Sequence, residues 1–369
     1  MELKVFNKNL DLIGVIDSFS HLIWNRKYND VGIFQMDILF TNEVNSILQI
    51  DNIIYKDNGE CGFIVSKEIK TDGSGTESIQ IKGKFILGYL ERRIIWGCEE
   101  INSNIIDASY RLINNNCIEC IDERKIPNLI LDENKLDIDV NLIKQVSYEN
   151  LLDTLILITQ NNELGMKVDF DIINKKLVFK IYKGIDRSIN QSVVAPVIFS
   201  RDFENVLEQN YFESNSNYKN VGLVGGAGDG VERKLAIVGN GSGIERHELF
   251  IDARDIQNTR EVKENEKTKN EVIPDDEYSE LLITRGKEKM LDYHEVKTFD
   301  TSINKDANIK YIDDYNLGDI VTIFDKRWGI TIDTRITGIS EIYDTNGVSL
   351  EITFGNNIPT LMQIIKKKG

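Results

Sequence analysis

The chain has 369 residues, of which 41% are hydrophobic, and its formal net charge is −16. This length exceeds one ordinary domain, so we expect two or three packed cores. The acidic balance disfavours a surface for nucleic acid or for an anionic membrane, since both carry negative charge, and we expect neither partner. No apolar run approaches membrane-spanning length, and the start, "MELKVFNKNLDLIGVID", lacks the basic and apolar regions of a secretory signal.

The first 95 residues have the pattern of short strands. In "GIFQMDILF" the side chains of Phe34, Met36, Ile38 and Phe40 fall on one face, which is the period of a half-buried strand. Turn signals at "KDNGE" and "TDGSG" space the strands as an antiparallel meander or small barrel does. We predict a first β-barrel over residues 1–95, completed by part of residues 196–220.

Residues 96–195 are predicted to form an inserted α/β domain, because the apolar residues adopt a helical period from about Ile101. The first helical stripe consists of Ile105, Ile106, Ser109, Leu112 and Ile113. Ser147 is the predicted N-cap of a second helix with Glu149 in its first turn, and Gly165 is predicted to end it. The buried side of this second helix is expected to hold Tyr148, Leu151, Leu152, Leu155 and Ile158.

A β-hairpin is predicted directly after this helix, in "MKVDFDIINKKLVFKIYKG". Its apolar residues alternate on two successive strands: Met166, Val168, Phe170 and Ile172, then Leu177, Phe179 and Ile181.

Four cysteines, Cys61, Cys98, Cys117 and Cys120, are too few in so long a chain for the disulfide framework of a secreted protein. A reducing cytoplasm is therefore the expected place of folding. Cys117 and Cys120 have the C-x-x-C spacing of half a zinc site or a redox pair, but no second pair accompanies them. Buried thiols, with Cys117 on a strand, are the preferred interpretation, and no metal is expected.

Residues 221–243, "VGLVGGAGDGVERKLAIVGNGSG", are rich in glycine. A Walker loop needs Lys and then Ser or Thr after its last glycine, but "VER" follows Gly230. A dinucleotide loop opens a helix, whereas Gly226, Gly228 and Gly230 lead into "ERKLAIV", a predicted strand. We interpret the stretch as the turn of a β-hairpin and expect no bound cofactor.

Residues 257–284 are predicted to form a polar loop and a short helix. The segment "QNTREVKENEKTKNEVIPDDE" is too poor in apolar side chains to offset the entropy of ordering, and we predict a mobile loop or exposed linker. Pro274 and the acidic residues after it favour a helix start. The packing side of that helix is predicted to consist of Tyr278, Leu281, Leu282 and Met290.

The C-terminal part is again predicted to be β-structure. Hairpins are expected around Lys326 to Gly329 and at Asn346-Gly347, a dipeptide suited to a type I′ turn. The last strand places Val348, Leu350, Ile352 and Phe354 on one face. Residues 196–256 and 285–357 are assigned to a second β-barrel, and residues 358–369, with the lysines Lys366 to Lys368, to a frayed C-terminal tail. The predicted fold class is α+β and predominantly β, with two antiparallel β-barrel-like domains and an inserted α/β domain.

The three histidines, His21, His247 and His294, do not complete a catalytic motif. "HELFI" and "HEVKT" begin like the metalloprotease H-E-x-x-H, but Ile251 and Thr298 stand where the second histidine is needed. "GNGSG" lacks the glycine of a G-x-S-x-G nucleophile elbow. We nominate no catalytic, cofactor-binding or metal-ligating residue and expect no enzyme.

Six segments, taken in order, resemble the baseplate hub or tail-tip proteins of long-tailed phages and phage-tail-like bacteriocins. They are "WNRKYNDVGIFQM" (24–36), "YKNVGLVGGAGDGVER" (218–233), "HELFIDARDI" (247–256), "LLITRGKEKMLDY" (281–293), "YNLGDIVTI" (315–323) and "LEITFG" (350–355). Each segment alone is unspecific, whereas their joint order is typical of the family. Residues 96–195 match mainly in pattern.

The resemblance implies a structural protein built from two related β-barrels and an α/β insert, with the glycine turn and the "FIDARD" strand in barrel packing. It further implies a homotrimeric ring whose six barrels continue the six-fold tail tube and whose far side accepts a three-fold spike or fibre for host attachment. The implied partners are the tail tube protein, spike, fibre or other baseplate proteins, and the tape-measure protein. The implied location is the virion tail or a tail-like particle, assembled in the bacterial cytoplasm.

Two other functions stay open at this point. Hubs of this kind sometimes carry a fused cell-wall hydrolase, and the many acidic residues allow a tail-tip hydrolase with paired carboxylates. The chain stops shortly beyond "LEITFG", so we expect no fused hydrolase here. A carbohydrate-binding module is the third alternative.

Overall fold

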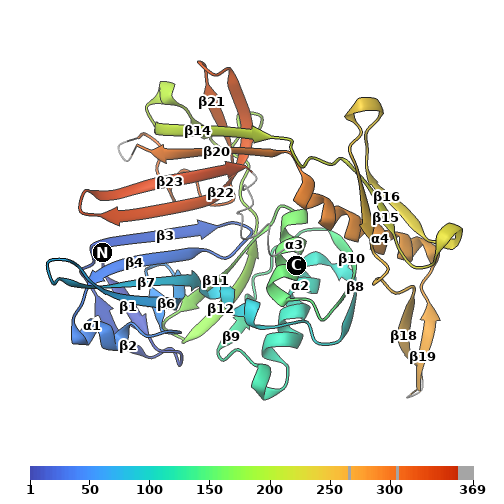
Figure 1. Ribbon diagram of the computed structural model, residues 1–369, viewed down its shortest axis with the longest axis horizontal. Helices are drawn as coiled ribbons and strands as arrows, with labels where there is room; N and C mark the ends of the chain where they lie inside the picture. The colour runs from blue at the N-terminus through green and yellow to red at the C-terminus, as the bar shows by residue number, and fades with distance from the viewer. Residues whose placement is uncertain (265–266, 305–306, 356–369) are drawn as a thin grey trace.

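A computed structural model describes residues 1–264, 267–304 and 307–355 (Figure 1). Among the described residues, strands account for 44% and helices for 20%, which confirms the predicted predominantly β class. The tail predicted for residues 358–369 lies outside the described residues.

The main sheet has 13 strands among the described residues, and eight successive antiparallel strands form its middle, in the order β14-β20-β23-β22-β3-β4-β7-β6. Figure 1 shows them stacked from top to bottom on the left. The path continues through β5, β1 and β2, while β21 joins β22 and pairs with β13. The bounds are β14 (Val206–Ser214), β20 (Val296–Ile303), β23 (Gly347–Gly355), β22 (Ile330–Asp344), β3 (His21–Lys27), β4 (Ile33–Leu39), β7 (Glu77–Phe85), β6 (Cys61–Thr71), β5 (Ile53–Tyr55), β1 (Leu3–Phe6), β2 (Leu12–Ile16), β21 (Ile320–Asp325) and β13 (Ile198–Phe199).

The two halves of this sheet have separate cores. In the first half Leu3 of β1 packs in one cluster with Trp24 of β3, although β1 and β3 are far apart in the pairing order. In the second half Phe199 of β13 packs with Phe299 of β20 in the same way. Each end of the sheet therefore curls over its own core, but pairing among the described residues is an open path and closes no ring.

The alternation in β4 is confirmed. Phe34, Met36 and Ile38 are buried and Phe40 is partly buried, and the short α1 (Asn42–Ile47) follows. The two predicted turns lie where the sequence places them, between β5 and β6 and between β6 and β7.

Part of residues 196–220 was predicted to complete the first half of the sheet, but these residues belong to the second half. Val197, Phe199 and Val206 all join the core of the second half. β13 pairs with β21 and β14 pairs with β20. Their pairing partners, β21 and β20, come from the C-terminal part of the chain. The alternation of apolar residues within a strand does not show which distant strand it pairs with.

The insert after β7 is mixed α/β. Its elements are β8 (Cys98–Asn104), α2 (Ile105–Ile113), β9 (Leu129–Leu131), β10 (Asn141–Ser147), α3 (Leu151–Asn161), β11 (Gly165–Asp171) and β12 (Lys176–Tyr182). The stripe of α2 is buried and the β11–β12 hairpin is antiparallel, both as predicted. Phe6 of β1 lies edge-on against Phe170 of β11, with ring centroids 4.9 Å apart. The insert and the underside of the first half thus share one hydrophobic core.

The predicted start and end of α3 are wrong. The N-cap is Asn150, whose side chain accepts hydrogen bonds from the amides of Leu152 (3.0 Å) and Asp153 (3.3 Å). Ser147 is paired with Cys98 as the last residue of β10, and Tyr148 turns the chain with a φ of 55°, so its ring is 66% exposed. Gly165 begins β11.

A second group of elements lies between β14 and β20, at the right of Figure 1. It consists of β15 (Val221–Gly225), β16 (Leu235–Gly239), β17 (Glu248–Asp252), β18 (Thr259–Glu264), β19 (Lys267–Val272) and α4 (Asp275–Met290). β16-β15-β17 form a three-stranded sheet that packs against α4, whose predicted packing side is confirmed.

Two expectations for this segment are wrong. The glycine turn and the "FIDARD" strand belong to this separate sheet and not to the second barrel-like half, because Val224 and Ile251 pack on Tyr278 and Leu282 of α4. The predicted loop at residues 257–277 contains the antiparallel β18–β19 hairpin. Backbone pairing forms there without the apolar alternation on which the prediction relied.

Both C-terminal hairpins are present, between β21 and β22 and between β22 and β23. The prediction of a type I′ turn is wrong, because such a turn needs a positive φ at both central residues. Asp344 pairs with Gly347, and of the residues in this turn only Gly347 has a positive φ, of 119°.

Candidate functional site

The glycine-rich stretch is a β-hairpin, as predicted. β15 and β16 pair antiparallel, and the residues between them hold a single 3₁₀ turn (Gly230–Glu232) where a phosphate loop would open a helix. Arg233 occupies the turn and donates from Nη2 to the carbonyl of Gly225 (2.9 Å) and to Oδ1 of Asp252 (2.7 Å). Gly228 has a φ of 95°, in the region that favours glycine.

Glycine also allows this sheet to approach α4 closely. A Cβ at Gly226 would lie 2.6 Å from the hydroxyl oxygen of Tyr278, which accepts from the amide of Ala227 (2.8 Å) and donates to the carbonyl of Ile256 (3.0 Å). On the helix itself, a Cβ at Gly286 would lie 2.3 Å from Cγ2 of Val238. The glycines therefore serve packing and turn geometry.

Gly286→Ala is expected to lower the free energy of unfolding by about 1–3 kcal/mol, because the added methyl group overlaps Val238 and forces the helix away from the sheet. The measurement is urea denaturation followed by circular dichroism. Gly73→Ala is the matched control, since a Cβ there meets nothing within 4 Å. Equal stability of the two variants would contradict the close approach.

All four cysteines are free thiols, and no disulfide joins them. Cys117 is buried in a π-helical turn (Asn114–Ile118) after α2 and not on the predicted strand, and burial raises the pKa of its thiol to about 12. Cys61 is buried on β6, where burial holds its pKa well above the ordinary value. Within the described ranges, no three His, Cys, Asp or Glu side chains are grouped so as to hold a metal ion.

His21 and His247 have different neighbours. Nδ1 of His21 is 3.6 Å from Oδ2 of Asp37 on β4, and the ring of His247 lies against Tyr218 with centroids 5.5 Å apart. His294 follows the 3₁₀ turn after α4. Of the described helices, none is both long enough and apolar enough to cross a membrane.

A buried charged cluster lies where the two halves of the main sheet meet. Arg26 on β3, only 5% exposed, donates to Glu60 from Nε (2.5 Å) and Nη2 (2.6 Å) and lies 3.2 Å from Oε1 of Glu341 on β22. Lys56, 7% exposed, lies 2.7 Å from Oε2 of Glu341. The Tyr311 ring packs over the Arg26 guanidinium, with the centroid 5.5 Å away. Lys56 also lies 3.5 Å from Oδ1 of Asp57, and the cluster ties β22 to β3 and to the turn before β6.

The cluster brings two glutamates, Glu60 and Glu341, onto the same arginine, as a hydrolase with paired carboxylates brings two acids to one site. A general acid needs a raised pKa. Burial of Glu341 favours its protonated form, but the charges of Arg26 and Lys56 oppose this and hold the pKa of Glu341 below its ordinary value. The carboxylate of Glu341 is therefore set to stay ionised within the cluster.

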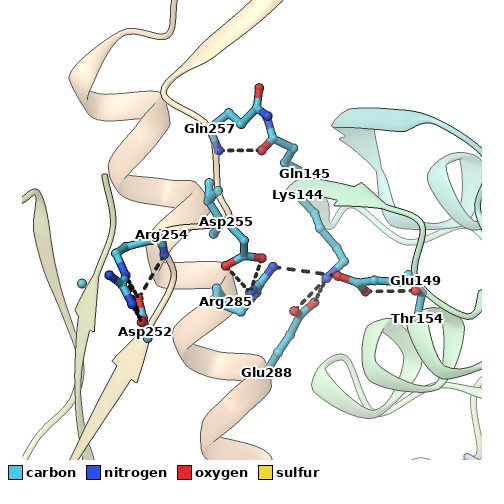
Figure 2. Close-up of polar contacts among 12 residues, drawn as sticks. Lys144, Gln145, Glu149, Thr154, Asp252, Arg254, Asp255, Gln257, Arg285 and Glu288 are labelled. Carbon is cyan, nitrogen blue, oxygen red and sulfur yellow. Dashed lines mark hydrogen bonds and ion pairs between the residues drawn. The ribbon is translucent and has the colours of Figure 1, made fainter. Parts of the chain in front are cut away.

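A second buried ion pair fastens α4 to the insert (Figure 2). Lys144 on β10 reaches across to Glu288 on α4, with Nζ 2.7 Å from each carboxylate oxygen, and the two side chains are 3% and 5% exposed. Beside it, Arg285 of α4 donates to Asp255 (2.9 Å) and lies 3.8 Å from Glu149. These contacts fix the helix and its three-stranded sheet on the α/β insert.

Sequence reasoning missed both ionic clusters, although a signal was present. Arg26 follows Leu22 and Trp24 at the inward positions of β3, and Lys144 stands between Leu142 and Val146 on β10. A charged residue at an inward position of an alternating strand indicates a buried partner.

Two surface hollows lie near α4. One is lined by Asn102, Ile143, Pro274, Asp276, Glu277 and Glu280, and the other by Asp252, Arg254 and Asp255. In the second, hydrogen bonds from Arg254 lower the pKa of Asp252 to about 2. Neither hollow is lined by the glycines of the β15–β16 turn.

This arrangement of sheets is the fold of phage tail proteins. The 43 kDa tail protein of prophage MuSo2 from Shewanella oneidensis superposes with a TM-score of 0.61 at 11% identity, covering 96% of this chain and 98% of that one. The tail protein from Neisseria meningitidis MC58 gives 0.58 at 12% identity and covers 96% of both chains. Prophage tail protein gp18 from Listeria monocytogenes EGD-e gives 0.57 at 14% identity and covers 100% of this chain and 98% of that one.

The chain belongs to the family of Siphovirus ReqiPepy6 Gp37-like proteins, whose model matches residues 2–356. The resemblance to phage tail proteins found in the sequence is thereby confirmed. No curated protein sequence matches the chain.

Proposed function

We propose that three copies of this tail protein form a ring that joins the six-fold tail tube to a three-fold spike or fibre. The protein acts through its shape and its interfaces, without a catalytic residue, metal or cofactor. Its partners are the tail tube protein on one side, spike, fibre or other baseplate proteins on the other, and the tape-measure protein. It resides in the virion tail or a tail-like particle after assembly in the bacterial cytoplasm.

The observation that carries this proposal is that the main sheet contains two four-stranded units with separate cores. β3-β4-β7-β6 and β22-β23-β20-β14 are two four-stranded units, each with its own core. In both units a hairpin of two consecutive strands, β3–β4 or β22–β23, lies next to a second antiparallel pair. A protein with two similar units per copy presents six of them in a three-copy ring, which matches a six-fold tube.

The two units are the barrel-like domains of this proposal. They are joined through β22 and β3 and by the Arg26 cluster, so each copy offers both as one rigid block. The insert and the α4 group branch from the two ends of this block, since they enter after β7 and between β14 and β20.

Purified protein is expected to elute with a mass three times the 42.2 kDa of one chain. Light scattering coupled to size-exclusion chromatography measures the mass, and electron microscopy of single particles measures the symmetry, which is expected to be three-fold down the ring axis. A chain that stays monomeric at high concentration, and also in the presence of its tube and tip proteins, would overturn the proposal.

A further inference from the structure

Exposed aromatic side chains lie at neighbouring positions on the surface of the α/β insert. Trp96, just before β8, is 59% exposed, and Tyr148, between β10 and α3, is 66% exposed. Ile95 holds the two positions together, since its amide donates to the carbonyl of Glu149 (2.9 Å) and its carbonyl accepts from the amide of Tyr148 (3.0 Å). Large aromatic side chains with this much exposure are typical of binding surfaces.

Trp96 is held in place by a buried asparagine and an arginine. Its amide donates to Oδ1 of Asn116 (3.0 Å), and the guanidinium of Arg124 lies over its ring, 4.5 Å from the centroid. Asn116 is 2% exposed, and its Oδ1 also accepts from Nη2 of Arg124 (3.1 Å). The same Nη2 donates to the carbonyl of Ile94 (2.6 Å). The cation therefore covers one face of the indole, and the exposure of Trp96 leaves the other face open to solvent.

The backbone is irregular at two points of this surface. Asn116 belongs to the π-helical turn Asn114–Ile118, and π-helical turns are rare and frequently lie at functional sites. Tyr148 has a φ of 55°, a left-handed conformation that is unfavourable for any residue except glycine and that also clusters at functional sites. Two independent irregularities therefore support the exposed rings of Trp96 and Tyr148, which points to a binding site.

The groups around Trp96 are suited to an N-acetylated amino sugar. An open indole face packs against the C–H face of a pyranose ring. Both described hydrogen bonds of the Arg124 side chain use Nη2, so Nε and Nη1 keep N–H groups that can donate to an acetamido carbonyl. The carbonyls of Ile94 and Ile121 both accept from Arg124, so these residues flank it, and their side chains are 47% and 55% exposed. They offer an apolar contact for the acetamido methyl group.

We propose that the patch formed by Ile94, Trp96, Ile121, Arg124 and Tyr148 binds a polysaccharide that contains N-acetylated amino sugars. One sugar ring stacks on Trp96 and presents its acetamido group to Arg124 and the two isoleucines, while Tyr148 contacts the adjoining sugar. The site adds a binding function to the structural role of the protein. It lies within one insert and does not depend on the three-copy ring.

Titration with chitohexaose, an oligomer of N-acetylglucosamine, tests the site. The measurement is iodide quenching of tryptophan fluorescence in Trp328→Phe, in which Trp96 is the one exposed tryptophan because Trp24 is fully buried. Chitohexaose is expected to shield Trp96 from iodide. Maltohexaose, which lacks acetamido groups, is expected to bind at least about tenfold more weakly, because it leaves the arginine donors unpaired.

Substitutions at the two rings give a second measurement, by titration calorimetry with chitohexaose. Trp96→Ala and Tyr148→Gly are each expected to weaken binding about tenfold or more. Glycine adopts a φ of 55° without strain, so Tyr148→Gly removes the ring and keeps the turn. Trp328→Ala is the matched control and is expected to bind normally, since Trp328 is also exposed and lies 5.5 Å from the guanidinium of Arg201.

Three outcomes would overturn the saccharide site. They are no binding of chitohexaose by the wild-type chain, binding that is unchanged in both patch variants, and shielding of Trp96 that appears on trimer formation without any sugar, which would assign the patch to a protein contact. A chain that binds chitohexaose through Trp96 but never trimerises would support the site and overturn only the proposed ring.

Discussion

Replacing Arg26 with methionine is expected to lower the free energy of unfolding by about 3–5 kcal/mol, the range found when one partner of a buried ion pair is removed. Methionine keeps the apolar stem but removes the charge that faces both Glu60 and Glu341. Glu60 then keeps only the indole N–H of Trp24, 3.0 Å away, as a donor from this cluster. The substitution is therefore expected to weaken the junction between the two halves of the sheet.

Urea denaturation at pH 7 measures this effect. Arg254→Met is the matched control, because Arg254 pairs with Asp252 at the surface and is 63% exposed there, and it is expected to leave stability unchanged. Arg26→Met with the same stability as this control would show that the cluster contributes nothing to the junction.

The Arg26 effect is also expected to depend on pH. The pKa of Glu341 is lower in the folded chain than in the unfolded chain. The ionised Glu341 therefore contributes its full stabilisation at any pH above the unfolded-state pKa. This stabilisation is lost as the pH falls through the folded-state pKa. The stability difference between wild type and Arg26→Met is therefore expected to shrink in acid.

Lys144→Met is expected to have an effect of similar size, about 3–5 kcal/mol, because it leaves the buried carboxylate of Glu288 without its cation. The loss of stability is expected at the contact between α4 and the insert. Hydrogen exchange across residues 275–290 locates it, since α4 should open more readily than β3 or β22.

The double variant Lys144→Met with Glu288→Leu is expected to recover most of this loss, because two apolar side chains of similar volume carry no desolvation cost. Lys234→Met is the control, since Lys234 pairs with Asp275 on the same helix but at its exposed side. A double variant as unstable as Lys144→Met would mean that packing, and not the unpaired charge, causes the loss.

Local patterns predicted most of the elements of this fold. The alternation in Phe34, Met36 and Ile38 gave β4, and the stripe from Ile105 to Ile113 gave α2, because each pattern is contained in one element. The cap of α3 was misplaced, because Ser147 and Asn150 are both good N-caps and only the pairing of Ser147 with Cys98 decides between them.

Long-range pairing could not be predicted in the same way. Arg26 and Glu341 are far apart in the chain, as are Lys144 and Glu288, and no spacing rule connects them. The inward positions of Arg26 and Lys144 showed that partners exist but not which ones. The same holds for β14, whose partner β20 follows only after the whole α4 group.

The length of β22 has a mechanical consequence. This strand pairs with β21 and β23 and, over Gly338 to Tyr343, with β3 of the other half. Backbone hydrogen bonds in an antiparallel ladder stand perpendicular to the strands. A force directed along the strands would therefore load all the bonds of this seam together and not one after another, so this is the direction in which the junction of the two halves is mechanically strongest.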